Sequence, residues 1–140
     1  MTGRHAPSLD GMGLRSEVNE HVPPAAPGEF AVPHVGPLAV WPPVVLAPMA
    51  GVTNAPFRSL CREFGAGLYV SEMITARGLV DGHLKTSRLA HFDPTETPRS
   101  IQLYGTNPDT LAQATKVLAE EWGVHHIDMN FACRGDLAHR

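Results

Sequence analysis

Four short apolar runs along the chain each lie next to side chains that could take part in chemistry. An amide can donate and accept hydrogen bonds at once, a thiol can be a nucleophile or a proton donor, and a carboxylate can accept a proton. Amide, thiol and carboxylate side chains next to these runs are Glu72, Gln102, Asn130 and Cys133. The other residues at the ends of these runs are Pro48, Met49, Ala50 and Met73. Because ligands bind at the carboxyl ends of parallel strands, we expect these residues to converge on one site.

Each of these side chains also has a structural interpretation. Gln102, flanked by apolar residues in an expected strand, could merely satisfy buried polar groups. Asn130 could end a strand in an Asx turn, and Glu72 could cap a helix or lie in a loop. Met49 and Met73 are of a residue type that often fills cores. Their common position at strand ends is what favours a shared function.

The first apolar run leads into a turn built from small residues. Pro48 and Gly51 stop the run, because proline cannot donate to a sheet and glycine permits a sharp turn. Thr53 or Asn54 can cap the helix predicted over residues 55–64, which carries one apolar face. Such a turn would let backbone N–H groups approach a flat or anionic ligand.

The order of the expected elements predicts an α/β fold. Strands are predicted over residues 44–47, 68–72, 100–104 and 124–129, and helices over 55–64, 75–82 and 108–122. Strands that alternate with helices imply a parallel sheet with right-handed crossovers, either doubly wound or a (β/α)8 barrel. The GxGxxG fingerprint of the first is absent. Because a whole barrel needs about 250 residues, we expect a partial TIM barrel of about four βα units.

Composition narrows the possible classes of function. The chain has 140 residues and a formal net charge of −3, so its overall charge does not attract nucleic acid. It has no apolar run of membrane-spanning length and no secretory signal, so we expect a cytoplasmic protein that binds no membrane. Cys61 and Cys133 lack CxxC spacing, and we expect neither a metal site nor a disulfide. Residues 1–36 are rich in Pro and Gly and are predicted to be a disordered leader, which leaves 37–140 as the domain.

Four stretches closely resemble one enzyme family. They are VVLAPMAGVTNAPFR at residues 44–58, CREFGAGLYVSEMI at 61–74, PRSIQLYG at 98–105 and HIDMNF at 126–131. Together they make residues 36–133 similar to the N-terminal half of the catalytic domain of bacterial tRNA-dihydrouridine synthases, in the DusB-like subgroup. Similar PMAG turns occur in other FMN barrels, so another FMN-dependent barrel oxidoreductase acting on a small molecule stays open as an alternative.

The resemblance implies a (β/α)8 barrel followed by a small helical RNA-binding domain. It implies that FMN, reduced by NADPH, passes hydride to C6 of a uridine turned out of a tRNA. Carried over by position, Pro48, Met49 and Ala50 line the flavin, and Gln102 hydrogen-bonds its ring. An amide suits that place because it can match both donors and acceptors on the edge of the ring.

On the substrate side, the resemblance implies that Asn130 and Glu72 lie near the reacting base and that the thiol of Cys133 protonates its C5. The family pattern is Asn-x-Gly-Cys-Pro, whereas this chain has Ala132 and Arg134 at the glycine and proline positions, which puts the geometry of this loop in doubt. The divergence after Cys133 and the early end suggest a frameshifted or prematurely terminated gene. We therefore expect an incomplete fragment of the enzyme whose own activity is in question; a degenerate product without enzymatic activity is the other alternative.

Overall fold

The computed structural model of this chain describes residues 28–131. The chain divides into two units, Met1–Ala31 and Val32–Arg140. Of the first unit only residues 28–31 are described, and they form a turn and bends. Residues 1–27 of the predicted leader therefore lie outside the described residues. Near the end of the predicted leader, His34 and Val35 form the first strand of the second unit.

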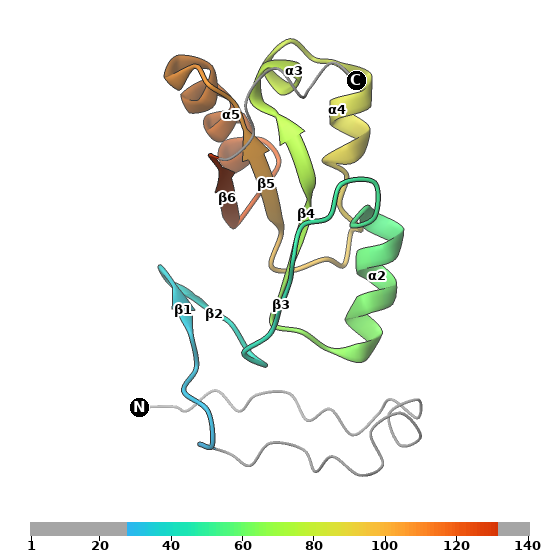
Figure 1. The fold of residues 1–140 in the computed structure, drawn as a ribbon, viewed down its shortest axis with the longest axis vertical. Coiled ribbons are helices and arrows are strands. Elements are labelled where there is room, and N and C mark those ends of the chain that lie inside the picture. Colours follow the sequence, from blue (N-terminus) through green and yellow to red (C-terminus); the bar gives the residue numbers. More distant parts are fainter. Residues whose placement is uncertain (1–27, 132–140) are drawn as a thin grey trace. The chain divides into compact units, whose positions relative to one another are not determined.

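The second unit alternates strands and helices after an initial hairpin (Figure 1). Its elements are β1 (His34–Val35), β2 (Leu38–Ala39), β3 (Val45–Leu46), α2 (Ala55–Phe64), β4 (Leu68–Thr75), α3 (Ala76–Val80), α4 (Leu84–Leu89), β5 (Ser100–Tyr104), α5 (Pro108–Glu120) and β6 (His126–Asn130). β1 and β2 pair antiparallel, and β3 to β6 form a parallel sheet in the order β3-β4-β5-β6. Each strand of that sheet lies beside the next strand in the chain, as consecutive βα units require. The predicted α/β class and parallel sheet are confirmed.

The two longest helices each begin after an asparagine cap. Of the two caps considered for α2, Asn54 is the one used: its Oδ1 accepts from the N–H of Phe57 at 3.0 Å. Oδ1 of Asn107 accepts from the N–H of Thr110 at 2.9 Å at the start of α5. Both helices have a proline in the first turn, where its missing N–H would have no intrahelical partner anyway. Strong local signals therefore fix where these helices begin.

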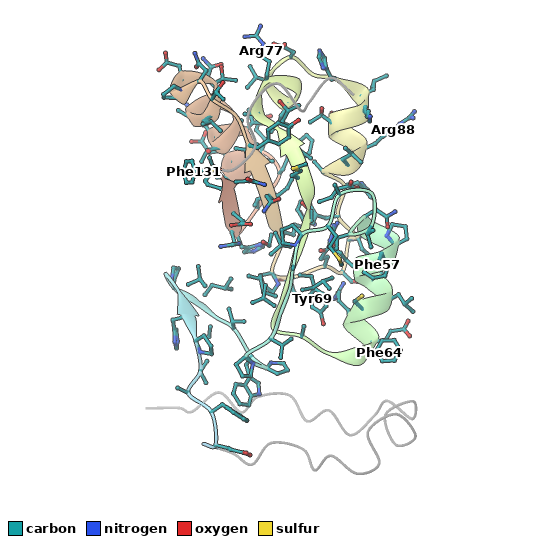
Figure 2. The ribbon with its side chains drawn as sticks, viewed as in Figure 1. Phe57, Phe64, Tyr69, Arg77, Arg88 and Phe131 are labelled. Atoms are coloured by element: carbon teal, nitrogen blue, oxygen red, sulfur yellow. The ribbon has the colours of Figure 1, made fainter. Side chains whose placement is uncertain are left out.

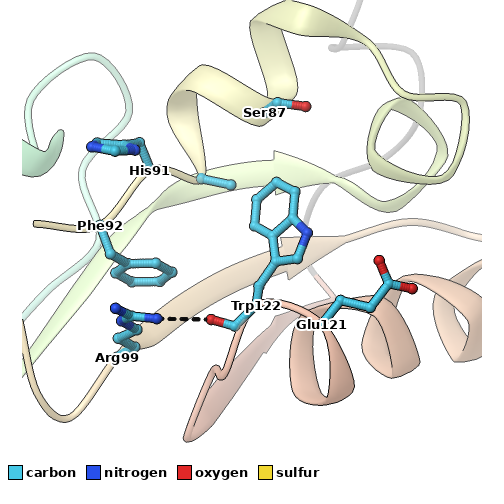
Figure 3. Close-up of a pocket in the computed structure, with 7 residues that line it drawn as sticks. Ser87, His91, Phe92, Arg99, Glu121 and Trp122 are labelled. Atoms are coloured by element: carbon cyan, nitrogen blue, oxygen red, sulfur yellow. Dashed lines mark hydrogen bonds between the residues drawn. The ribbon is translucent and has the colours of Figure 1, made fainter. Parts of the chain in front are cut away.

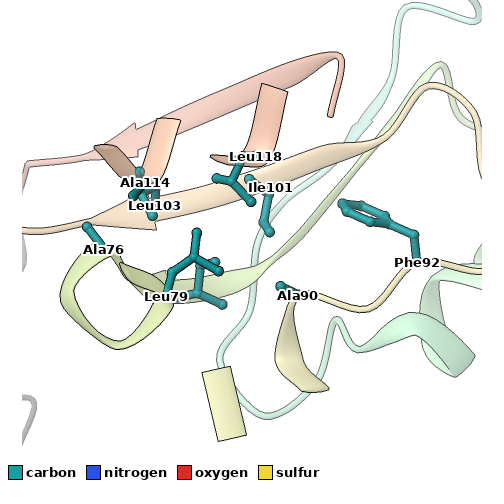
Figure 4. Close-up of a cluster of buried hydrophobic side chains, with 9 residues drawn as sticks. Ala76, Leu79, Ala90, Phe92, Ile101, Leu103, Ala114 and Leu118 are labelled. Atoms are coloured by element: carbon teal, nitrogen blue, oxygen red, sulfur yellow. The ribbon is translucent and has the colours of Figure 1, made fainter. Parts of the chain in front are cut away.

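One face of the sheet is covered by helices and forms the main core (Figure 4). Ile101 and Leu103 of β5 are fully buried there, in one cluster with Ala114 and Leu118 of α5. The cluster also contains Ile74, Ala76, Leu79, Ala90 and Phe92. Because side chains alternate along a strand, Gln102 between the two buried residues must face the other side of the sheet.

On β5 and β6 that opposite face is polar along the whole length of both strands. The register pairs across β5 and β6 on this face are Ser100–His126, Gln102–Asp128 and Tyr104–Asn130. Near the amino end of β4 the same face is apolar: Leu68 and Val70 form a buried cluster with Val40, and Leu38 of the hairpin packs against it. The hairpin therefore covers this face near the amino end of β4, and the polar side chains lie on β5 and β6.

β4 and β6 differ from their predicted bounds. The sequence predicts that β4 ends at Glu72, but the strand continues to Thr75. A register shift between Val70 and Met73 inserts an extra residue in β4, and the strand then resumes its pairing with β5. β6 begins later than predicted and includes Asn130, which lies in the strand and not in a turn after it.

The apolar face of α2 is largely exposed within the described residues (Figure 2). Leu60 and Phe64 are 52% and 56% exposed, and Cys61 is half-buried. The residue of α2 that is buried is Arg58. Two charged side chains, Arg58 and Arg62, and not the apolar face, therefore fasten this helix to the loop between α4 and β5.

Candidate functional site

The turn between β3 and α2 is held by hydrogen bonds on several sides. Thr53 is fully buried, and its hydroxyl accepts from the N–H of Met49 at 2.9 Å and donates to the carbonyl of Met49 at 3.1 Å. The N–H groups of Val52 and Thr53 both donate to that carbonyl, each at 3.0 Å. The N–H of Gly51, a residue with φ of 75°, donates to the carboxylate of Glu72 at 2.7 Å. The turn is therefore fixed before any ligand binds.

These bonds change what the turn can offer to a ligand. The sequence predicts that its backbone N–H groups approach a ligand, but those of Met49, Gly51, Val52 and Thr53 are used inside the protein. Ala50 is the residue of this turn whose N–H has no acceptor in the part of the chain that the structure describes. One amide, not a row of amides, is available to a bound molecule here.

Glu72 lies beneath this turn, inside β4, with 6% of its surface exposed. Its carboxylate holds Gly51, and its own N–H donates to the carbonyl of Thr53 at 3.3 Å. It does not cap α3, since the N-cap of that helix is Thr75. In this geometry Glu72 fixes the shape of the turn, and its expected place near a substrate stays a prediction.

A buried arginine ties the turn to a second loop. The guanidinium of Arg58 forms a bidentate ion pair with the carboxylate of Glu96, with Nε–Oε1 at 2.7 Å and Nη2–Oε2 at 3.0 Å. Both residues are buried. The guanidinium also donates to the carbonyls of Thr53 at 2.8 Å and His91 at 2.9 Å. Its other contact is the ring of Phe92, whose centroid lies 5.2 Å from Cζ. The turn and the loop between α4 and β5 are thereby joined.

Polar side chains form a hydrogen-bonded row on the polar face of β5 and β6. Gln102 donates through Nε2 to Oδ2 of Asp128 at 2.6 Å and accepts through Oε1 from Nδ2 of Asn130 at 3.4 Å. Nδ2 of Asn130 also lies 3.8 Å from the sulfur of Met73 on β4. The structure thus brings together Gln102, Asn130 and Met73, all predicted for the site. It adds Asp128, which is not among the residues predicted for the site.

The turn and the row are neighbours through β4. Glu72 contacts the turn, and Met73, the next residue, contacts the row. Met49 is 39% exposed on the turn. Phe131, which follows β6, is 84% exposed and is the last described residue (Figure 2). Cys133 falls outside the described residues, so the structure does not test its predicted place beside the row.

Two surface cavities lined by described residues lie elsewhere, on the helix-covered side of the sheet. One of about 330 Å³ is lined by Ser87, Ala90, His91, Phe92, Arg99, Glu121 and Trp122 (Figure 3). Its arginine already has partners, because Nη1 of Arg99 donates to the carbonyl of Trp122 at 3.0 Å and the guanidinium lies over Phe92. The other, of about 380 Å³, borders α4. Neither shares a residue with the turn or the row, which remain the candidate site.

The described residues limit which charged ligands this site can hold. Within residues 28–131, no three His, Cys, Asp or Glu side chains lie close enough together to hold a metal ion. β4, β5 and β6 carry no Lys or Arg. The site therefore presents amide, thioether and carboxylate groups, which suit a neutral heterocyclic ring better than a phosphate.

In the same described range, no helix combines the length and the apolar character needed to cross a membrane.

Comparisons with known proteins agree on one family. A model of the dihydrouridine synthase (Dus) family matches residues 45–137, which include both the turn and the row. A protein named probable tRNA-dihydrouridine synthase from Mycobacterium tuberculosis (strain H37Rv) is 49% identical over 106 residues, covering 71% of this chain and 27% of the relative. The protein of the same name from Mycobacterium leprae is 44% identical over 115 residues, covering 64% of this chain and 30% of the relative.

A relative with a more specific name gives the same result. tRNA-dihydrouridine synthase B from Pseudomonas aeruginosa is 43% identical over 105 residues, covering 74% of this chain and 31% of the relative. The chain thus spans only about a third of the length of the curated relatives it matches, between 27% and 31% in these three cases.

Proposed function

This chain belongs to the dihydrouridine synthase family, and we propose that it forms the first part of an enzyme that reduces uridine in tRNA to 5,6-dihydrouridine. In this proposal FMN is the cofactor and NADPH its reductant. The observation that carries the proposal is the row of Gln102, Asp128 and Asn130 beside the fixed β3–α2 turn. The turn follows the end of β3, Asn130 ends β6, and Gln102 and Asp128 lie two residues before the ends of β5 and β6 in the same parallel sheet. In α/β folds, ligands bind at the carboxyl ends of such strands.

The donor set fits the flavin ring of FMN. Gln102 has a second amide hydrogen and further acceptor capacity beyond its bonds to Asp128 and Asn130, so it can bind a ring edge that carries both N–H and C=O groups. The N–H of Ala50 can donate to another ring acceptor. The side chains of β4, β5 and β6 supply no lysine or arginine for the phosphate of FMN. Groups beyond these strands would have to bind it.

The chain's own residues would bind and orient the reactants. Pro48, Met49 and Ala50 line the ring, and Glu72 keeps that turn in shape through Gly51. FMN, when bound, supplies the hydride chemistry, and the protein supplies position and exclusion of water.

On the substrate side, Asn130 lies next to Gln102 and would face the uracil ring. Cys133 would donate the proton to C5, a suitable role because an ordinary thiol, with a pKa of about 8.5, is mostly protonated at neutral pH. The target base must leave its stack to reach these groups, because C5 and C6 are covered by neighbouring bases in a helix.

Family membership supports a proposal for the rest of the architecture. β3 to β6 would be the first four strands of a (β/α)8 barrel, and a helical RNA-binding domain would follow it. β3 and β6 are the outer strands of the four-stranded sheet, so further strands could pair with both. A tRNA substrate would place the reaction in the cytoplasm.

The test restores a complete enzyme. We would join this chain to the remaining C-terminal part of the Mycobacterium tuberculosis relative and express the product in a strain that lacks dihydrouridine synthases. We expect dihydrouridine in the tRNA of that strain and a flavin absorbance band in the purified protein. Replacing Cys133 by alanine should remove the product and keep the flavin.

Other outcomes would favour the alternatives. Bound FMN with no dihydrouridine would favour an FMN-dependent oxidoreductase that acts on a small molecule. A protein that neither binds FMN nor forms dihydrouridine would contradict the proposal and favour a degenerate product.

A further inference from the structure

Gln102 and Asp128 face each other across two neighbouring strands. They are register partners on β5 and β6, two strands that lie side by side in Figure 1. Both face the polar side of the sheet, and their contact of 2.6 Å is short for an amide and a carboxylate. The contact of Gln102 with Asn130 is longer, at 3.4 Å. The stronger of the two bonds therefore comes from Asp128.

The chemistry of this contact fixes the direction of the Gln102 amide. An ionised carboxylate has no hydrogen to donate, so only the NH₂ end of the amide can face it. The carbonyl end then points toward Asn130, which offers an NH₂ group in return. With a neutral amide in place of Asp128 this constraint disappears, because an amide can serve as either donor or acceptor.

We propose that Asp128 is a positioning residue that sets the direction of the Gln102 amide and thereby the order in which donor and acceptor groups are presented to the ring of FMN. The inference rests on the proposed function, and it concerns a residue that would touch no reacting atom. A reversed amide would place a carbonyl against a ring carbonyl and an NH₂ group against a ring N–H. Two matched hydrogen bonds would then become two mismatches.

The same two strands provide a matched control. Two residues earlier on each strand, Oγ of Ser100 and Nδ1 of His126 lie 2.8 Å apart. This pair is a second side-chain contact between β5 and β6 on the same face of the sheet. This link lies farther from the carboxyl ends and does not touch Gln102. Breaking it should loosen the strand pair without changing the direction of the amide.

The experiment compares three forms of the full 140-residue chain: wild type, D128N and H126N. FMN is titrated into each, and binding is followed by flavin fluorescence and by the position of the flavin absorbance band. Chemical denaturation measures the stability of each form. We expect D128N to bind FMN about tenfold more weakly and with a shifted absorbance band, a change of about 1.4 kcal/mol. H126N should bind as the wild type does, even if it loses as much stability as D128N.

A second measurement keeps failure of this inference separate from failure of the proposed function. The side-chain NH₂ signals of Gln102 are recorded by NMR in the wild type and in D128N, without FMN. We expect slow hydrogen exchange in the wild type and faster exchange in D128N. Equal FMN affinity in the two forms would overturn the inference and leave the flavin site intact. If no form of the 140-residue chain binds FMN, the same comparison is made in the enzyme completed with the C-terminal part of the relative, where lack of FMN binding contradicts the proposed function. Unchanged Gln102 signals in D128N would overturn the inference in either case.

Discussion

Replacing Glu96 by glutamine tests how strongly one buried ion pair holds the β3–α2 turn. Glu96 is 3% exposed and Arg58 is fully buried, and their two contacts are 2.7 and 3.0 Å long. Glutamine keeps the shape of the side chain but removes its charge. The guanidinium then stays buried with two carbonyls and one aromatic ring as its remaining partners.

The expected loss is large because an uncompensated charge stays in the interior. Removing one partner of a buried ion pair costs about 3–5 kcal/mol, and total stability is about 5–15 kcal/mol for a typical domain. E96Q should therefore lose a large part of the free energy of unfolding, measured by urea denaturation followed by circular dichroism. Replacing both residues, in R58M/E96L, should recover much of the loss, because no buried charge remains.

The chain contains a matched control on its surface. Nε of Arg77 and Oδ2 of Asp81 also lie 2.7 Å apart, but the two side chains are 73% and 32% exposed. Exposed pairs spaced by four residues on a helix contribute about 0.3–0.5 kcal/mol, so R77Q should change stability very little. The reasoning is refuted if E96Q and R77Q lose similar free energies of unfolding, because burial would then not decide the strength of the pair.

Three further changes probe local features of the fold. Gly67→Ala should destabilise the chain by about 1–3 kcal/mol or more, since an added Cβ would lie 2.3 Å from the carbonyl oxygen of Pro42; a thermal melt equal to that of the wild type would contradict this. Asn107→Ala removes the cap of α5 and should cost about 1 kcal/mol in urea denaturation, whereas Asn107→Asp should cost much less. Hydrogen bonds from the side chain and backbone of Thr95 lower the pKa of Asp93 in the folded state from 3.8. The ionised carboxylate of Asp93 therefore stabilises the fold above pH 3.8, and this contribution is lost as the pH falls through the lower pKa of the folded state. In T95A an NMR titration should find this pKa closer to 3.8; an unchanged pKa would exclude the hydroxyl as the main cause.

Local sequence signals predicted the elements that depend on local chemistry. The bounds of α2 and β5 agree with the predictions, and Asn54 caps α2 as one of the two candidates. A capping side chain and a proline in the first turn act within a few residues, so they can be recognised along the sequence. The parallel order of the sheet follows from the alternation of strands and helices.

Features that depend on distant partners could not be predicted in the same way. Arg58 can be buried because it pairs with Glu96. This partner lies 38 positions farther along the chain, in a loop whose path no local sequence pattern predicts. The extension of β4 depends on a register shift against β5, which only the paired strands define.

In the candidate site, too, the local features were predicted from the sequence and the contacts with distant partners were not. The sequence indicated Gln102, but the contact that orients it comes from Asp128, its register partner on another strand. It also indicated a small-residue turn, but not that four of its N–H groups are used inside the protein.

The most direct test of the flavin site is to map where FMN binds. ¹⁵N-labelled full-length chain is titrated with FMN, and changes in the NMR signals are followed residue by residue. We predict that the largest changes occur at the backbone N–H of Ala50 and the side-chain NH₂ of Gln102, and that the cavity near Arg99 and Trp122 stays unchanged. Changes centred on that cavity, or no changes at saturating FMN, would contradict a flavin site at the carboxyl ends of these strands.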